Sequence, residues 1–273
     1  MRLPRSDEEF FALLGQLEQE IQQGQAEVAL ETLGLLERAL GDQPAASFVY
    51  ALQGRAHQER RRLAESCEAY EQALAGFRAL GATPLVATTL NNLGNALSDR
   101  GRTAEAQERY EEALRLYRAL AEEDPRAFNP VLASTLNNLG NALRGRGRTA
   151  EAQERYEEAL RLRRALAEED PRAFNPDVAM TLNNLGNALR GRGRTAEAQE
   201  RYEEALRLRR ALAEEDPRAF NPVLASTLNN LGNALRGRGR TAEAQERYEE
   251  ALRLRRALAE EDPRAFNPDV AMT

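Results

Sequence analysis

The sequence repeats itself over most of its length. The segment TLNNLGNALRGRGRTAEAQERYEEALRL begins at Thr135 and recurs unchanged at Thr181 and Thr227. A Leu-Gly pair marks each of four copies at intervals of 46 residues, at Leu93, Leu139, Leu185 and Leu231. A catalytic site needs one arrangement of different residues, whereas stacked repeats use one packing solution many times. The repeat therefore indicates a stacked, repetitive fold.

Each repeat carries the pattern of two helices. Asn175 as N-cap and Pro176 at the first helical position start helix A, whose apolar positions follow helical spacing: Val178, Leu182, Leu185 and Leu189. Gly191 and Gly193 interrupt the pattern, and Thr195 is the expected N-cap of helix B. The apolar or small stripe of helix B is Ala198, Tyr202, Ala205, Leu206, Leu208 and Leu212. We expect helix B to end near Asp216-Pro217 and a connector to run on to Asn221.

A single helix pair has apolar faces too small to be buried alone, so the pairs must stack on their neighbours. Small residues at the contact faces allow close approach, for example Gly186, Ala188, Ala198 and Ala205. The sequence therefore predicts an all-α solenoid of stacked antiparallel helix pairs, with Leu185 buried.

The landmarks LxxLGxAL, a following Gly, EA and YxxAL resemble the tetratricopeptide repeat (TPR). They hold in four copies and partly in a weaker copy around Gly54. The long repeat and the phrase NNLGNAL are similar to the kinesin light chain repeats and to bacterial TPR arrays. The resemblance implies a right-handed superhelix in which helix A lines a concave groove.

The resemblance also sets the expected domain limits. Residues 46–273 form the array, with repeats centred on Gly54, Gly94, Gly140, Gly186 and Gly232 and a truncated helix at the end. Residues 1–45 read as a degenerate helix pair that caps the stack, with Ser6 and Glu9 as a capping box. The ending NPDVAMT, where a new helix A should begin, suggests a fragment of a longer array or an engineered one.

Asparagines recur on helix A although asparagine is a poor helix former. In related arrays the matching residues form a ladder that binds the backbone of an extended peptide, and a carboxamide has both a donor and an acceptor for that role. The candidate peptide-binding asparagines are Asn91, Asn95, Asn137, Asn141, Asn183, Asn187, Asn229 and Asn233. The alternative is that these amides satisfy neighbouring helices and were copied by duplication.

Arginines one helical turn beyond the ladder complete the candidate site: Arg144, Arg190 and Arg236. They could favour acidic peptides, or they could be solvated. A carboxylate clamp for a chaperone tail would need cations where this chain has Asn91, Met180 and Asn184, so we do not expect that activity. Ser134 and Ser226 alternate with Met180 and would tune side-chain preference.

Charge and composition exclude several functions. All 38 basic residues are arginine, and the balance after residue 81 is close to neutral, which argues against nucleic-acid binding. The RGRGR segments lie in tight turns between predicted helices, so we do not read them as RNA-binding. No apolar run is long enough for a membrane span or a signal peptide, which predicts a soluble, cytoplasmic protein that does not bind membranes.

The residues for catalysis are few. His57 is the only histidine and Cys67 the only cysteine, and both read as structural; no phosphate loop, metal-ligand cluster or nucleophile motif is present. We therefore expect no enzyme activity and no cofactor.

The expected function is a protein-interaction scaffold that binds an extended peptide or a partner helix in the concave groove. Two alternatives stay open. The chain could be a self-assembling or engineered repeat array that associates head to tail, or the sensor arm of a larger regulator.

Overall fold

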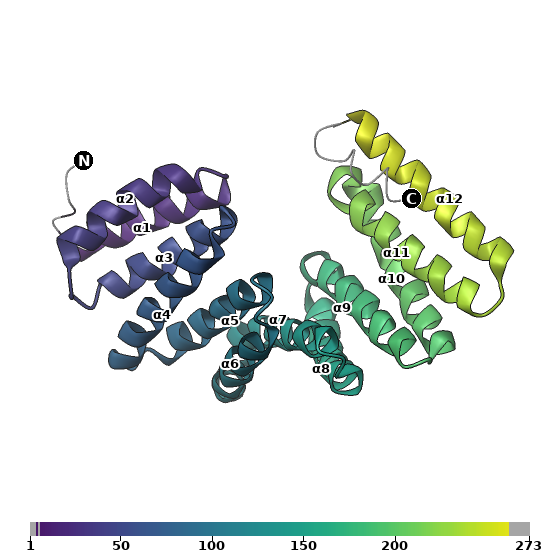
Figure 1. Cartoon of the computed structure of the whole chain (residues 1–273), viewed down its shortest axis with the longest axis horizontal. Coiled ribbons are helices and arrows are strands. Elements are labelled where there is room, and N and C mark those ends of the chain that lie inside the picture. Colours follow the sequence, from purple (N-terminus) through teal and green to yellow (C-terminus); the bar gives the residue numbers. More distant parts are fainter. Residues whose placement is uncertain (1–3, 5, 262–273) are drawn as a thin grey trace. The chain divides into compact units, whose positions relative to one another are not determined.

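The computed structural model describes residue 4 and residues 6–261. In this part of the chain there are twelve helices and no strand: α1 (Asp7–Gln22), α2 (Ala26–Leu40), α3 (Ala46–Glu59), α4 (Leu63–Ala79), α5 (Thr83–Asp99), α6 (Thr103–Glu123), α7 (Pro125–Gly145), α8 (Thr149–Glu169), α9 (Pro171–Gly191), α10 (Thr195–Glu215), α11 (Pro217–Gly237) and α12 (Thr241–Glu261). Figure 1 shows them in chain order. The all-α prediction is confirmed.

The helices belong to two compact units, Met1–Ala142 and Leu143–Thr273, which are described separately. In the N-terminal unit α1 packs on α2, α3 on α4 and α5 on α6; in the C-terminal unit α9 packs on α10 and α11 on α12. Within each unit one pair also packs on the next, through contacts such as α4 with α5 and α10 with α11. Short linkers make packed neighbours antiparallel, so each unit is a stack of helix pairs, as predicted for a solenoid.

The first helices of successive pairs form what we call the inner face of each unit. These helices touch each other, α1 with α3, α3 with α5, and α9 with α11. Second helices are bridged instead by long side chains: Arg78 to Glu112 at 2.5 Å, Arg164 to Glu204 at 2.5 Å, and Arg210 to Glu250 at 2.6 Å. The closer approach of the first helices places them on the inner side of the stack.

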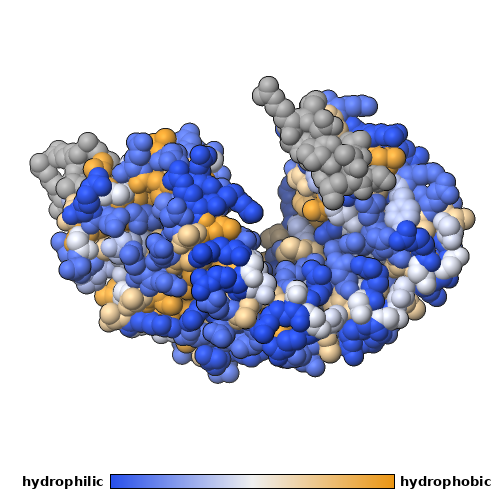
Figure 2. All heavy atoms as spheres, in the orientation of Figure 1, coloured by the Kyte–Doolittle hydropathy of each residue, from blue (hydrophilic) through white to orange (hydrophobic). Residues whose placement is uncertain are grey.

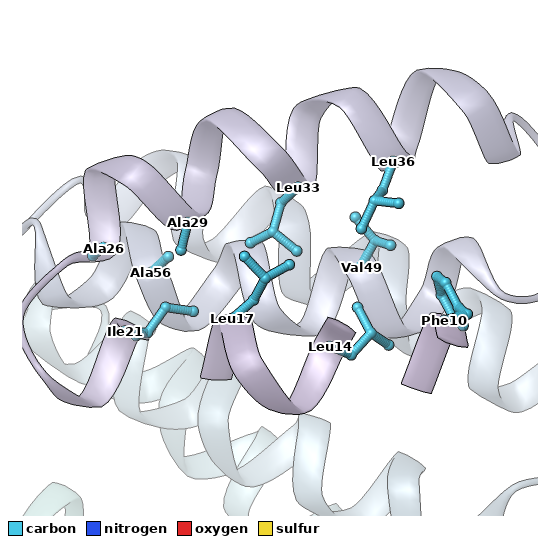
Figure 3. Packing of buried hydrophobic residues seen from close by; sticks show 10 residues of the cluster. All are labelled: Phe10, Leu14, Leu17, Ile21, Ala26, Ala29, Leu33, Leu36, Val49 and Ala56. Carbon is cyan, nitrogen blue, oxygen red and sulfur yellow. The ribbon is translucent and has the colours of Figure 1, made fainter. Parts of the chain in front are cut away.

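The N-terminal pair has its own apolar core. Phe10, Leu14, Leu17 and Ile21 on α1 face Leu33 and other small or aliphatic residues of α2, and Val49 and Ala56 of α3 close the cluster (Figure 3). The Ser6 hydroxyl accepts a hydrogen bond from the Glu9 backbone N–H at 3.2 Å, so the expected N-cap of α1 is present. That this pair serves as a cap stays a prediction, and the expected truncated helix lies outside the described residues.

The predicted stripe of helix A is buried in α9, where Val178, Leu182, Leu185 and Leu189 are all shielded from water. The predicted stripe of helix B needs one correction. Leu208 is only half-buried, and its neighbour Arg209 is the buried residue, with 6% of its surface exposed. Position 209 lies seven residues after buried Tyr202, on the same helical face.

The predicted start of helix A was wrong. Asp170 and Asp216, not Asn175 or Asn221, are the N-caps: the Asp170 carboxylate accepts from the Ala173 N–H at 3.1 Å. The following proline takes the first helical position, where no N–H donor is needed. The expected six-residue connector is therefore one residue long, and the second proline, Pro176, lies inside α9.

The predicted N-cap Thr195 was also wrong, because it is already the first residue of α10 and makes no capping hydrogen bond. The N-cap residue is Arg194, which has no side-chain oxygen to accept from the first turn. Its guanidinium instead donates through Nε to the Glu197 carboxylate in that turn, at 2.6 Å. A salt bridge thus takes the place of the expected hydroxyl cap.

The RGRGR segments connect each repeat to the preceding one. Gly193 has φ of +74°, a left-handed conformation that suits glycine and turns the chain. On either side of it, Arg192 donates to the Gln153 side-chain oxygen at 2.6 Å and Arg194 donates to the same oxygen at 3.2 Å. We call this contact the glutamine joint. Gln199 accepts in the same way from Arg238 and Arg240.

Candidate functional site

The candidate asparagines lie on the first helices of their pairs: Asn91 and Asn95 on α5, Asn137 and Asn141 on α7, Asn183 and Asn187 on α9, and Asn229 and Asn233 on α11. All are half-buried except Asn137, which is 3% exposed. Half-burial leaves part of a side chain in reach of a ligand while its other part contacts the protein.

In three of the repeats one asparagine is held by a tyrosine of the next helix. The Tyr110 hydroxyl donates to Asn95 Oδ1 at 2.8 Å, and Tyr202 donates to Asn187 Oδ1 at 2.8 Å. Tyr248 repeats the contact with Asn233 at 2.9 Å. These hydrogen bonds use the amide oxygen and fix the orientation of the amide group.

The tyrosine ring explains the glycine beside each of these asparagines. A Cβ atom added at Gly186 would lie 2.5 Å from Tyr202 Cε1, and one added at Gly94 would lie 2.6 Å from Tyr110 Cε1. The ring therefore packs directly on the helix backbone, and only glycine leaves it room.

Further hydrogen bonds of the asparagines connect the first helices of successive pairs. Asn230 donates to Asn183 Oδ1 at 3.0 Å, from α11 to α9. On α7, Asn138 donates to Asn95 Oδ1 at 3.1 Å and Thr135 donates to Asn91 Oδ1 at 3.1 Å. The amide oxygens of these asparagines thus accept hydrogen bonds from neighbouring helices, which is what the alternative interpretation expected.

The candidate arginines lie in the last turns of α7, α9 and α11 and are exposed. Burial raises the pKa of the Tyr202 hydroxyl, and the nearby Arg190 guanidinium partly opposes that rise. Arg144 has the same effect on the pKa of Tyr156. Arg190 thus lies near the tyrosine hydroxyl that holds Asn187.

The side chains expected to tune preference are accessible to different degrees. Met180 on α9 is 36% exposed and Ser226 on α11 is exposed, whereas Ser134 on α7 is half-buried. Repeats of nearly identical sequence therefore present different side chains at this position.

Sequence reasoning missed two buried arginines on the second helices. Arg163 and Arg209 are 2% and 6% exposed. Arg209 donates to the Val223 carbonyl at 2.6 Å and to the Thr227 hydroxyl. Burial lowers the pKa of the Arg209 guanidinium to about 10. The repeat register could have revealed them, because the equivalent position of the first long repeat holds Tyr117, a large aromatic residue that is buried.

The two residues considered for chemistry have structural surroundings. Burial lowers the pKa of His57, and the exposed carboxylates of Glu65 and Glu27 oppose part of that shift. Cys67 takes the position of Gln153 in the glutamine joint, where burial raises the pKa of its thiol and a hydrogen bond with Arg100 opposes the rise. Among the described residues no group of three or more histidine, cysteine, aspartate or glutamate side chains could hold a metal ion. None of the described helices is long and apolar enough to cross a membrane.

Helix pairs stacked through shared glycine, alanine and tyrosine contacts define the class of α-helical repeat proteins. A family model of the tetratricopeptide repeat matches residues 49–119, 119–165, 132–211 and 177–257. The chain belongs to the tetratricopeptide repeat family, as its landmarks predicted. Repeats of this family generally serve as non-catalytic scaffolds. No curated protein matches the sequence significantly.

Solved structures show the same fold at low sequence identity. BtubC (BKLC) from P. vanneervenii is 24% identical with a TM-score of 0.67, covering 89% of this chain and 92% of its own. A putative kinesin light chain with nearly identical TPR-like repeats from Podosopora anserina is 20% identical with a TM-score of 0.61, covering 78% and 99%. The quorum sensor NprR from B. thuringiensis is 16% identical with a TM-score of 0.68, covering 95% and 67%.

Proposed function

We propose that the chain is a protein-interaction scaffold, without catalytic activity, that binds an extended peptide along the inner face of its repeats. The observation that carries this proposal is the orientation of the ladder amides. Tyr202 and Tyr248 use the oxygens of Asn187 and Asn233, which directs the Nδ2 donors away from the tyrosines. Fixed N–H donors suit the carbonyl oxygens of a peptide backbone, which every sequence offers.

The residues around the asparagine ladder would determine which peptide side chains the scaffold prefers. Arg190 and Arg236 add positive charge at the end of the inner face, and Met180 and Ser226 present different surfaces on successive helices. The family fold itself does not select a ligand, because the same helical repeat carries proteins as different as a quorum sensor and a kinesin light chain. The recognition must therefore come from these side chains.

The test replaces the donors and keeps the acceptors. In the variant Asn187→Asp with Asn233→Asp, a carboxylate oxygen still accepts from each tyrosine, while the N–H donors are replaced by oxygen. A random peptide display library is selected on the parent chain and on this variant. We expect peptides enriched on the parent to bind the variant at least tenfold more weakly, about 1.4 kcal/mol or more.

The matched control adds the same negative charge at exposed glutamines outside the inner face, Gln43→Glu with Gln72→Glu. We expect it to bind like the parent. If the ladder variant is folded and keeps the parent's affinity, the asparagines do not read the peptide. An equal loss in the control would assign the effect to net charge.

A further inference from the structure

The inner face changes its chemistry at α3. Alignment of Gly54 with Gly94 places Ala51, Leu52 and Arg55 where α5 has the asparagines of the ladder. Phe48 likewise occupies the position of Thr88. The asparagines thus begin only at α5, and α3 presents two apolar side chains and one arginine in their place.

These apolar side chains line a pocket of about 430 Å³. The first helices of three successive pairs contribute to it: Phe11 from α1, Phe48 and Leu52 from α3, and Leu85 from α5. Phe77 of α4 also lines the pocket. We call this the N-terminal pocket. Its volume and its largely apolar lining with a few polar groups are those of a ligand site. Figure 2 shows apolar surface among the helices of this unit.

Aromatic rings hold the pocket in shape. The Phe11 and Phe48 ring centroids are 5.3 Å apart at an interplanar angle of 90°, and those of Phe48 and Phe77 are 5.0 Å apart at 78°. Edge-to-face pairs of this kind are favourable beyond simple burial. Phe11 nevertheless remains 51% exposed. A ring that is fixed by its neighbours and still half in contact with water is available to a partner.

The three first helices that line the pocket, α1, α3 and α5, carry an excess of negative charge. The one lining cation of the pocket, Arg55, is paired with Glu18 at 2.6 Å. Helix α1 carries four more acidic residues and no basic one, and α5 ends at Asp99, which accepts a hydrogen bond from Gln58 at 3.1 Å. Burial raises the pKa of Tyr70, a lining residue; the Arg55 guanidinium opposes that rise and the Glu59 carboxylate adds to it. An apolar pocket between acidic helices is complementary to an apolar group flanked by cations.

We propose that the N-terminal pocket binds a large apolar side chain of a peptide that carries lysine or arginine close to that side chain. This inference rests on the proposed peptide-binding function and specifies its ligand in one place. A peptide that fills the pocket buries Phe11 and Leu52 and brings its cations close to the acidic helices α1, α3 and α5. An acidic segment would be repelled there.

The test uses the same random peptide display library with two variants of the pocket. Ala51→Arg places a bulky cation at the half-buried pocket wall, and Phe11→Ser removes the exposed ring. The control Val28→Ser removes an apolar side chain that is 58% exposed on α2 and does not line the pocket. Thermal unfolding shows that each variant is folded.

We expect parent-enriched peptides to share a large apolar residue next to lysine or arginine. Synthetic versions should bind Ala51→Arg and Phe11→Ser at least tenfold more weakly and Val28→Ser equally well. Replacing their basic residues by glutamate should abolish binding. Peptides that lack an apolar residue, that are acidic, or that bind both pocket variants like the parent overturn the proposal, and so does an absence of enrichment.

The ladder variant Asn187→Asp with Asn233→Asp distinguishes this proposal from the proposed function. Peptides lost on the ladder variant but kept on the pocket variants would leave the ladder as the site and remove the N-terminal pocket. Peptides lost on the pocket variants but kept on the ladder variant would establish the pocket and remove the ladder.

Discussion

At the scale of residues, a glycine, an asparagine and a tyrosine act together in three of the long repeats. The tyrosine ring rests on the glycine, and its hydroxyl holds the asparagine that follows the glycine in sequence. The Leu-Gly landmark was recognisable in the sequence, but its reason was not, because the ring that needs the space lies sixteen residues further on, as Tyr202 does from Gly186.

Gly186→Ala should destabilise the chain by about 1–3 kcal/mol, because the added methyl group overlaps the Tyr202 ring. Denaturant unfolding of the two proteins measures the difference. Gly237→Ala is the matched control, since its added Cβ would lie at an ordinary 3.7 Å from Thr195. Equal stabilities of Gly186→Ala and the parent would show that the ring moves freely.

Arg209 is a buried cation whose partners are a carbonyl and a hydroxyl. Thr227→Val should cost about 1–3 kcal/mol, because it leaves the guanidinium with one acceptor fewer. Arg209→Met should be neutral or stabilising, since replacing a buried charge by an apolar side chain of similar length removes its desolvation cost. A double-mutant cycle tests the coupling, and additive effects of the two substitutions would contradict it.

At the scale of elements, the sequence predicted that each repeat contains two helices and which faces they bury. Periodicity is a strong signal for both, and Val178 to Leu189 is buried as expected. The predicted helix starts were wrong because the sequence offers two similar start signals, Asp170-Pro171 and Asn175-Pro176. Stacking decides between them: helix contacts favour the longer helix, although Pro176 then lacks one hydrogen-bond donor inside it.

For the candidate site, the sequence predicted the asparagine positions but not the state of their amides. The tyrosines that bind Asn95, Asn187 and Asn233 come from the next helix, and the donor to Asn183 comes from the next repeat. Neither contact follows from spacing along one helix. The N-terminal pocket was missed for a similar reason, because three helices each contribute only a few of its residues.

The N-cap gives an element-scale prediction. Asp216→Ala should lower stability by about 1 kcal/mol, since the Ala219 N–H loses its acceptor at 3.0 Å. Asn221→Ala should leave stability unchanged or raise it slightly, because Asn221 lies inside α11 and alanine is the better helix former. Thermal unfolding compares the two variants, and the reverse order would restore Asn221 as the cap.

At the scale of the whole molecule, the repeated tyrosines make stability depend on alkaline pH. Burial raises the pKa of six tyrosines: Tyr50, Tyr70, Tyr110, Tyr117, Tyr156 and Tyr202. For Tyr156 the pKa rises to about 12. The unfolded chain releases these protons near pH 10 while the folded chain keeps them, so this stability is full below about pH 10 and is lost as pH rises towards about 12.

The melting temperature should therefore be nearly constant between about pH 8 and about pH 9 and fall steeply above about pH 10. Tyr156 alone accounts for a loss on the order of 3 kcal/mol at high pH. The chain contains no lysine, and Arg209, whose pKa burial lowers to about 10, titrates in the same range with the opposite sign and offsets part of the loss. Tyr156→Phe should reduce the slope. A melting temperature that stays flat to about pH 11 would contradict the assignment.

The glutamine joint has a consequence for how such an array changes over evolution. Gln153 accepts from Arg192 and Arg194, and Gln199, 46 residues later, accepts from Arg238 and Arg240. Each of these repeats thus encodes both the glutamine that accepts from the next repeat and the arginines that donate to the previous one. Unequal recombination can insert or delete one repeat without a compensating mutation, and the new junction is already correct. Near-identity of the repeats and variable array length in related genomes are the expected marks of that process.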